Sequence, residues 1–484
     1  MALKTILLSL AAMPFANSET VLGVYIFHRH GDRTPKSLAP TNLTALGADQ
    51  VFQSGGFYRA RYIASDSSSP IYGLSNDIAV PTQLDVVSPA DSVLQSSALA
   101  FLQGIYPPAG DNGVSILANT SEVRAPLNGY QYIPVGVSAT ASSNPNSENN
   151  EWLQGGSGCG NAMVSSNNYF QSADYLSTYD QTQSFYSGLL PVINGTFSAK
   201  QANFKNAYTI FDLINVATIH NQSIPSGQLL TTDTLRELKI LADAHEWGLA
   251  YNSSEPIRAI AGATLAAQIV QQLNTTLTGK GKTPIGIQFG AYASFMSFFG
   301  LAQLEKVSAD FTGVVDYASS MVFELVTNAS DVSKTNYPSP ADVSVRFMVA
   351  NGSAAQHTPQ LFPLFGQSET TLPWNTFAEE MGKFAIGDTA AWCQACGNTT
   401  GICASTAETS GSGDSGSVAT DAQSGNNISL PVAGVIGALV TLVVILGVEG
   451  LVYALAGLKL VRKSTLAADA AGAGATGAAG GSKA

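Results

Sequence analysis

Seven consecutive residues near the N-terminus, Arg29–Pro35, read Arg-His-Gly-Asp-Arg-Thr-Pro. The neutral imidazole of His30 can act as a nucleophile, and the planar guanidinium groups of Arg29 and Arg33 can hold an oxyanion through paired N–H donors. Because like charges disfavour a protonated imidazole, the two arginines should lower the pKa of His30 and keep it nucleophilic in mildly acidic surroundings. Phosphoryl transfer needs positioning and positive charge on the phosphoryl oxygens, and this cluster supplies both.

The preceding residues place this cluster at the end of a buried strand. Val21–Phe27 is a continuous apolar and aromatic run, which is typical of a strand covered on both faces in a parallel sheet. Ligand-binding groups of open parallel sheets gather at the carboxyl ends of the strands. A salt-bridged surface turn is the alternative interpretation of the seven residues, but their position directly after a buried strand favours a ligand site.

The rest of the N-terminal four-fifths of the chain alternates between strand and helix patterns. Helices are predicted at 46–64 and from 89–92 to Gly104, and helical patterns dominate 170–275, for example at 233–251 and 258–273. Strands are predicted at 85–88, 285–289, 319–326 and 343–348. Strands at both ends with helices between them predict an α/β domain with a helical insertion at about 150–280.

Composition and charge exclude several classes of protein. Of the 484 residues only 12% are charged, and the net charge is −12 without any basic block, so nucleic acid is excluded as a partner. Ten Asn-x-Ser/Thr triplets predict N-linked glycans that would supply surface polarity. Their asparagines are Asn42, Asn119, Asn194, Asn221, Asn252, Asn274, Asn328, Asn351, Asn398 and Asn427.

Both ends of the chain carry targeting signals. Residues 1–18 are typical of a signal peptide, 404–427 of a flexible Ser/Gly-rich stalk, and 459–484 of a short Ala/Gly-rich tail. The apolar run 430–458 is long enough to span a bilayer and is followed by Lys459, Arg462 and Lys463, which places the tail in the cytosol. A lipid-anchor signal is the alternative, but such a signal ends in its hydrophobic tail. We therefore expect a single-pass secretory-pathway protein whose domain 19–403 is extracellular or lumenal.

The chain contains four cysteines: Cys159, Cys393, Cys396 and Cys403. In an oxidising compartment they allow three full pairings, among which the sequence does not choose. Cys393 and Cys396 form a C-x-x-C, so a redox or zinc role is an alternative to structural disulfides. Because no second such pair or histidine pair completes a zinc site, we expect a disulfide clamp near the end of the domain and no metal or other cofactor.

The segment Arg29–Pro35 resembles the signature of the histidine acid phosphatases, within the phosphoglycerate mutase-like superfamily. A second segment, Ala98–Pro108, is similar to another motif of that family, and the resemblance extends from Val21 to about Cys403. It implies a three-layer α/β sandwich with a mainly parallel central sheet and a smaller helical domain. It also implies hydrolysis of phosphate monoesters, with His30 as the nucleophile that becomes phosphorylated and Arg29 and Arg33 as the residues that bind the phosphate.

Two family features are missing. Ser92 stands where the family has a third arginine, and the region 288–293, Gln-Phe-Gly-Ala-Tyr-Ala, lacks the His-Asp pair that protonates the leaving alcohol. Losing one oxyanion donor and general acid catalysis together would raise the barrier by roughly 5–9 kcal/mol. The sequence therefore leaves the proton donor unknown.

Other residues could replace the missing groups. His245 with Glu246, or Asp32, could act as the acid, although a packing histidine and a local hydrogen-bond acceptor are the simpler interpretations. The third cation could come from arginines elsewhere in the chain, and the candidates are Arg59, Arg61 and Arg124. His28 could line the pocket, but we expect it beneath the site.

Two functions follow. The first is an acid phosphatase that hydrolyses phosphate monoesters by the phosphohistidine route. The second is a cell-surface glycoprotein that retains an anion-binding pocket but has impaired catalysis.

Overall fold

The computed structural model describes residues 19–137, 158–220 and 228–404. The predicted signal peptide, the stalk beyond residue 404, the predicted membrane helix at 430–458 and the tail lie outside these residues. None of the helices within the described ranges combines the length and the apolar character needed to cross a membrane.

A central sheet organises the domain, in the strand order β10-β8-β7-β1-β6-β2-β5. Its parallel part consists of β5 (Gly136–Val137), β2 (Leu84–Ser88), β6 (Ile285–Gly290) and β1 (Thr20–Arg29). Strands β1 and β6 run in register from Val24 beside Ile285 to Arg29 beside Gly290. The carboxyl ends of these strands therefore meet at one edge, where β1 delivers Arg29.

The other part of the sheet is antiparallel. It consists of β7 (Ser320–Thr327), β8 (Val343–Ala350), β9 (Gln360–Leu361) and β10 (Thr371–Pro373). The sheet is thus mixed: the predicted parallel arrangement is confirmed for β1, β6, β2 and β5, whereas β7 pairs antiparallel with β1 and the later strands pair antiparallel with their neighbours.

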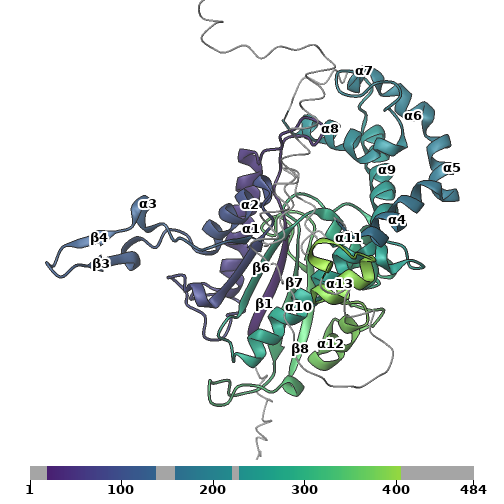
Figure 1. Cartoon of the computed structure of the whole chain (residues 1–484). Coiled ribbons are helices and arrows are strands. Elements are labelled where there is room, and N and C mark those ends of the chain that lie inside the picture. The colour runs from purple at the N-terminus through teal and green to yellow at the C-terminus, as the bar shows by residue number, and fades with distance from the viewer. Residues whose placement is uncertain (1–18, 138–157, 221–227, 405–484) are drawn as a thin grey trace, which may run out of the picture. The chain divides into compact units, whose positions relative to one another are not determined.

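Helices cover both faces of the sheet and give the predicted three layers (Figure 1). One face packs against α1 (Ala45–Tyr62) and α2 (Ser92–Ile105), and the other against α10 (Ile260–Thr278), α11 (Tyr292–Leu301) and α12 (Trp374–Gly382). The side chains of strand β1 alternate between the apolar cores on the two faces of the sheet. Val24 and Ile26 lie on the α1 side, and Tyr25 and Phe27 lie on the other side. Each such buried side chain stabilises the fold by about 1.5–3 kcal/mol.

The helical insertion contains α4 (Gly160–Asn168), α5 (Ala173–Gln181), α6 (Gln183–Gly188), α7 (Leu190–Ile193), α8 (Ala207–His220) and α9 (Thr232–Ala250). These helices form an arc beside the sheet domain (Figure 1). Helices α5–α9 share an apolar core of their own, in which Tyr186, Phe204 and Leu238 are fully buried. Helix α10, which the sequence grouped with the insertion, packs on β1 and belongs to the sheet domain.

A hairpin that the sequence did not predict projects from the sheet domain (Figure 1). It pairs β3 (Val114–Ile116) with β4 (Glu122–Arg124) and is followed by the short helix α3 (Pro126–Gly129). Strands of three residues with mostly exposed side chains give too little period-2 alternation to be recognised in a sequence.

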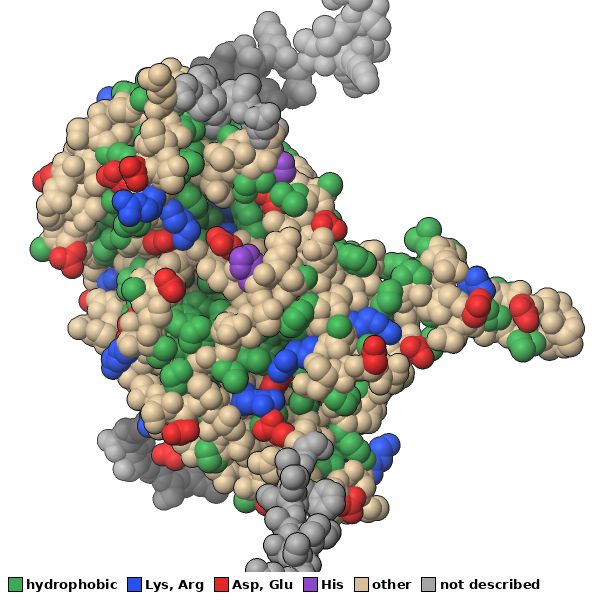
Figure 2. Space-filling model, turned by 180° about the vertical axis from the view of Figure 1, so that it is seen from behind, with side chains coloured by type: hydrophobic (Ala, Val, Ile, Leu, Met, Phe, Trp, Pro, Cys, Tyr) green, Lys and Arg blue, Asp and Glu red, His purple; other side chains and the backbone are tan. Residues whose placement is uncertain are grey.

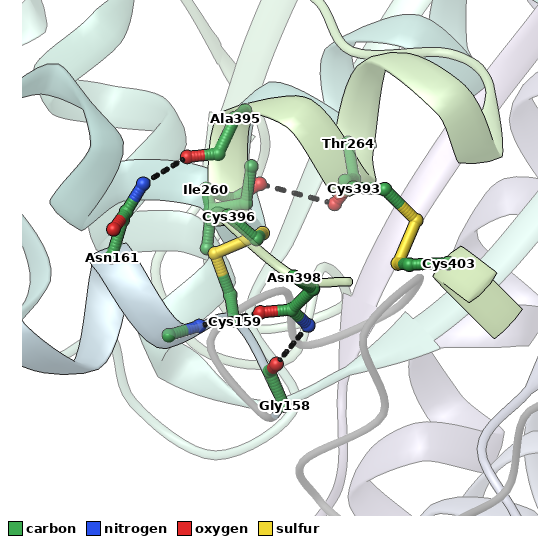
Figure 3. The surroundings of a disulfide bond; sticks show 11 residues. Gly158, Cys159, Asn161, Ile260, Thr264, Cys393, Ala395, Cys396, Asn398 and Cys403 are labelled. Atoms are coloured by element: carbon green, nitrogen blue, oxygen red, sulfur yellow. Dashed lines mark hydrogen bonds between the residues drawn. A yellow bond between two sulfur atoms is a disulfide. The ribbon is translucent and has the colours of Figure 1, made fainter. Parts of the chain in front are cut away.

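Two disulfides close the C-terminal part of the domain (Figure 3). Cys159 bonds to Cys396 and Cys393 bonds to Cys403, so the two cysteines of the C-x-x-C have different partners. Both cysteines of that motif lie on α13 (Thr389–Cys396), and the bond to Cys159 joins this helix to the start of α4. The predicted disulfide clamp is confirmed, and the pairing that the sequence left open is decided.

Candidate active site

The motif leaves β1 at the carboxyl edge of the sheet and is held there by the segment that enters β7. The backbone N–H of Arg29 donates to the carbonyl of Ser319 at 2.8 Å, and the N–H of Ala318 donates to the carbonyl of His30 at 2.9 Å. Ala318 has a φ of +60°, a conformation that few non-glycine residues adopt. The turn at Ala318 places the preceding residue, Tyr317, over the motif.

The loop after His30 packs tightly against the start of α1. A Cβ added to Gly31 would collide with the carbonyl oxygen of Gly47, and a Cβ added to Gly47 would collide with the carbonyl oxygen of Asp32. Thr44 caps α1 by accepting a hydrogen bond from the N–H of Gly47 at 3.0 Å. The glycine in the motif is therefore required by the close approach of two backbones.

Gly31→Ala should lower the free energy of unfolding by about 1–3 kcal/mol, because backbone atoms at an overpacked contact cannot turn away as a side chain can. Chemical denaturation of the purified protein measures this loss. Gly56→Ala is the control, because a Cβ at that position of α1 meets no atom within 4 Å. Equal stability of the two variants would contradict the packing role of Gly31.

The structure buries His30 completely and fixes its imidazole. Its Nδ1 lies 2.7 Å from the carbonyl oxygen of Gly31. Because a carbonyl can only accept, Nδ1 carries the proton, and the lone pair of the neutral ring is on Nε2. This tautomer is the one that a nucleophilic histidine requires.

His28 lies beneath the site, as the sequence predicted. Its ring is fully buried, contacts Phe101 and Phe289, and is 2.8 Å from the hydroxyl of Ser54 through Nε2. Burial lowers the pKa of His28 to about 4. His28 therefore stays neutral in mildly acidic surroundings and supports β1 without adding charge.

Arg29 lines a cavity of about 290 Å³ between the sheet edge and α8. Its guanidinium donates to the carbonyl of Val315 and stacks on the ring of Tyr317, 4.7 Å from the ring centroid. The imidazole of His30 packs on the same ring at a centroid distance of 5.6 Å. Burial raises the pKa of Tyr317 well above its ordinary value, so its hydroxyl stays protonated. Tyr317 is thus a neutral residue that contacts the cavity, the predicted nucleophile and a predicted phosphate ligand.

Arg33 is also buried, and it forms an ion pair that the sequence did not predict. Its Nη1 lies 2.9 Å from Oδ1 of Asp212 on α8, and its Nη2 donates to the hydroxyl of Tyr208 at 3.3 Å. Both partners of the ion pair are almost completely shielded from solvent. The second predicted phosphate ligand therefore lies in the same cluster as the first, next to a carboxylate.

Helix α8 is attached to the motif at two points. Asp212 bonds Arg33 and accepts from the backbone N–H of Lys36 at 2.8 Å. Two turns later, Nε2 of His220 lies 2.6 Å from Oδ1 of Asp32. The helical insertion is therefore joined to the predicted catalytic loop by charged groups, and Asp32 is the local hydrogen-bond acceptor that the sequence indicated.

His245 and Glu246 lie at the margin of the cluster. Nδ1 of His245 is 2.8 Å from Oε1 of Glu246, and Oε2 of Glu246 accepts from the hydroxyl of Tyr292 at 2.7 Å. Tyr292 begins α11 directly after β6, and its ring centroid is 5.3 Å from the guanidinium carbon of Arg29. The position after the late strand, where the family has its His-Asp pair, thus holds a tyrosine that faces Arg29.

The three arginines considered as a third cation have other partners. Arg59 donates to the carbonyl oxygens of Asn76 and Ile105, Arg61 pairs with Glu324, and Arg124 pairs with Asp111 on the projecting hairpin. Ser92 is exposed at the start of α2. Two cations that the sequence analysis did not single out lie near the cluster: Lys36, whose Nζ lies 5.3 Å from the ring centroid of Tyr292, and Lys239, which lines the same cavity as Arg29.

A sequence signal for Asp212 exists in retrospect. It is the single charged residue in the largely apolar stretch Ala207–Ile219. A carboxylate on the buried side of an apolar helix requires a charged or hydrogen-bonding partner. Tyr317 gives no comparable signal, because its position depends on the turn at Ala318.

Comparison with known proteins identifies the family of the chain. The family model described as histidine phosphatase superfamily, branch 2, matches residues 37–349, directly after the motif. The chain belongs to this superfamily. It is 25% identical to the lysosomal acid phosphatase of Xenopus laevis over 339 residues, which are 66% of this chain and 69% of that protein.

Solved structures of two phytases share the fold. The phytase of Citrobacter braakii superposes with a TM-score of 0.52 at 14% identity, over 79% of this chain and all of that one. The apo phytase of Hafnia alvei superposes with a TM-score of 0.50 at 13% identity, over 80% of this chain and 99% of that one. Membership in the superfamily supports phosphatase-like hydrolysis as the general activity.

Proposed function

We propose that this protein hydrolyses phosphate monoesters through a phosphohistidine at His30. The observation that carries this proposal is the fixed imidazole of His30, whose Nδ1 donates to Gly31 and whose Nε2 bears the lone pair, in one cluster with the guanidinium groups of Arg29 and Arg33. A phosphoryl group that approaches His30 would meet positive charge on its oxygens from these two arginines.

The reaction has two steps. Nε2 of His30 attacks phosphorus, the ester P–O bond breaks, and the alcohol leaves with a proton. A water molecule then attacks the phosphohistidine, the P–N bond breaks, and phosphate is released with His30 restored. Because Tyr317 contacts both the cavity and His30, its side chain must turn for a phosphoryl group to pass from the cavity to Nε2.

The substrate that fits best carries one phosphate. The charged residues that line the cavity are two cations, Arg29 and Lys239, and two carboxylates, Asp212 and Asp316, whose formal charges cancel. On the face of the molecule that Figure 2 shows, basic side chains lie next to acidic ones. A molecule with many phosphates needs an excess of positive charge, so a simple monoester is favoured over an inositol polyphosphate.

The covalent structure supports a compartment for the domain. Two disulfides that use all four cysteines are typical of an oxidising environment, and the relative from Xenopus is named a lysosomal protein. We place the domain in the secretory pathway, glycosylated and lumenal or extracellular, with 430–458 as its membrane anchor.

A second function, an anion-binding glycoprotein without turnover, is favoured by one observation. Tyr292 and Ala293 occupy the region where the family has its His-Asp pair, and Ser92 replaces the third arginine. Such a protein would bind inorganic phosphate at Arg29 and Arg33 without forming a phosphoenzyme.

Trapping the phosphoenzyme separates the two functions. The purified full-length protein is mixed with ³²P-labelled phenyl phosphate at mildly acidic pH and quenched with alkali, in which phosphohistidine survives. We expect label on the protein that acid releases and that is missing from His30→Ala. Labelling of both proteins alike would exclude His30 as the acceptor, and binding of phosphate without any label would favour the second function.

A further inference from the structure

We propose that Asp212 is the proton donor to the leaving alcohol, in place of the missing His-Asp pair. The proposal rests on the proposed hydrolysis at His30. It assigns a catalytic role to a residue of the helical insertion that the sequence analysis did not single out.

The first support is position. Asp212 lines the same cavity as Arg29 and Tyr317, and its carboxylate is 2.9 Å from Nη1 of Arg33. The hydroxyl of Tyr317 donates to its Oδ1 at 3.4 Å. A phosphoryl group held by Arg29 and Arg33 would therefore lie beside this carboxyl group. Proton transfer to the leaving oxygen requires such a neighbouring position.

The second support is the set of charged and polar groups that face Asp212. Its oxygens face the side chains of Arg33 and Tyr317 and the N–H of Lys36, while Arg29, Lys239 and Asp316 line the same cavity. When a phosphoryl group takes over Arg33, the carboxylate loses its cation and gains a negative neighbour. Both changes favour the protonated acid.

The proton balance closes without a further reactant. A phosphate monoester bound as its monoanion brings one proton, which passes to Asp212 as Arg33 turns to the phosphoryl oxygens. Asp212 then gives that proton to the ester oxygen while the P–O bond breaks, and the alcohol leaves neutral. In the second step the same carboxylate accepts a proton from the attacking water and passes it to the departing phosphate, which leaves as its monoanion and returns Asp212 and His30 to their starting states.

The other acidic groups near the motif fit this role less well. Asp32 is fully buried, is bonded to His220, and does not line the cavity. Glu246 accepts from Tyr292, faces His245, and does not line the cavity. Asp316 lines the cavity but is solvent-exposed, whereas Asp212 is buried against Arg33.

The test compares a substrate that needs a proton donor with one that does not. Glycerol 2-phosphate has a strongly basic alkoxide leaving group, whereas 4-nitrophenolate leaves without protonation. For Asp212→Asn in the full-length protein we expect kcat on glycerol 2-phosphate to fall by about 10²-fold or more, and kcat on 4-nitrophenyl phosphate to fall by about tenfold or less. Asp212→Glu, which keeps the carboxyl group, should retain the wild-type ratio of the two rates.

The control is another buried ion pair. Glu324 on β7 is fully buried and pairs with Arg61 at 2.8 Å and with Arg346 at 2.7 Å, outside the cavity. Glu324→Gln should destabilise the fold without changing the ratio of the two rates. If Asp212→Asn does not fold, Asp212→Glu provides the test. The proposal then requires that this variant keep the wild-type ratio of the rates on the two substrates.

Three results would overturn the proposal. One is an equal loss of both activities in folded Asp212→Asn, which would show that Asp212 only positions Arg33. Another is unchanged hydrolysis of glycerol 2-phosphate by that variant. The third is that the wild-type protein hydrolyses the aryl ester but not the alkyl ester, because this would show that no proton donor acts on the leaving group. A failure of the proposed function can be distinguished from a failure of the role of Asp212 alone, because in the first case His30→Ala would leave both activities intact.

Discussion

Replacing His30 by alanine should reduce kcat for every phosphate monoester by at least about 10³-fold, because the change removes the atom that forms the bond to phosphorus. The side chain is fully buried, and Nδ1 is already bonded to the carbonyl of Gly31. Steady-state hydrolysis of 4-nitrophenyl phosphate by the full-length protein measures the effect. The loss should be the same for aryl and alkyl esters, in contrast to the selective loss expected at Asp212.

His357→Gln is the matched control for this change. His357 is exposed, lies in the loop after β8, and does not line the cavity beside Arg29. Its replacement should leave kcat within about twofold of the wild type, as expected for a surface position away from the site. Residual activity of His30→Ala at the level of this control would remove His30 as the nucleophile, and with it the phosphohistidine route.

Arg29→Lys should lower kcat/KM by about 10²–10³-fold although the charge is kept. The guanidinium group is fixed by the carbonyl of Val315 and by the faces of Tyr317 and Tyr292. A lysine ammonium group is a point charge that cannot offer two parallel donors to a phosphoryl group or stack as a plane on these rings. Inhibition by inorganic phosphate should weaken in parallel, since product and substrate share the phosphoryl oxygens.

Arg236→Lys is the control for the Arg29→Lys variant. Arg236 lies on α9 with 74% of its side chain exposed, and its kinetic constants should not change. An Arg29→Lys variant that keeps both kcat/KM and the inhibition constant for phosphate would show that Arg29 holds the loop rather than the substrate. The phosphate ligand would then have to be sought at Arg33 and Lys36.

Local sequence was sufficient for the elements that present the motif. The apolar run before Arg29 predicted β1, because a strand buried on both faces needs apolar residues at every position. The helices α1, α2, α9 and α10 and the strands β2, β6, β7 and β8 agree with their predicted positions to within a few residues. Their apolar periodicities are long enough to be recognised, whereas those of β3, β4 and β5 are not.

The three motif residues were proposed from the sequence alone, but the groups around them were not. His30, Arg29 and Arg33 lie within five residues of the chain, so a single strand end brings them together. Asp212 and Tyr317 lie about 180 and 280 residues away and reach the motif because α8 and the loop before β7 pack on the sheet edge. No local pattern encodes such a contact, since it depends on how separate elements dock.

The sequence by itself thus determined the strand, the motif that follows it and the chemistry that these residue types allow. The tertiary structure decided the tautomer of His30, the pairing of the four cysteines and the placement of a carboxylate against Arg33. The physical reason is the range of the interactions. Backbone conformation and burial follow from neighbouring residues, whereas ion pairs, disulfides and cavities join residues that only the complete packing of sheet and helices brings within a few ångströms.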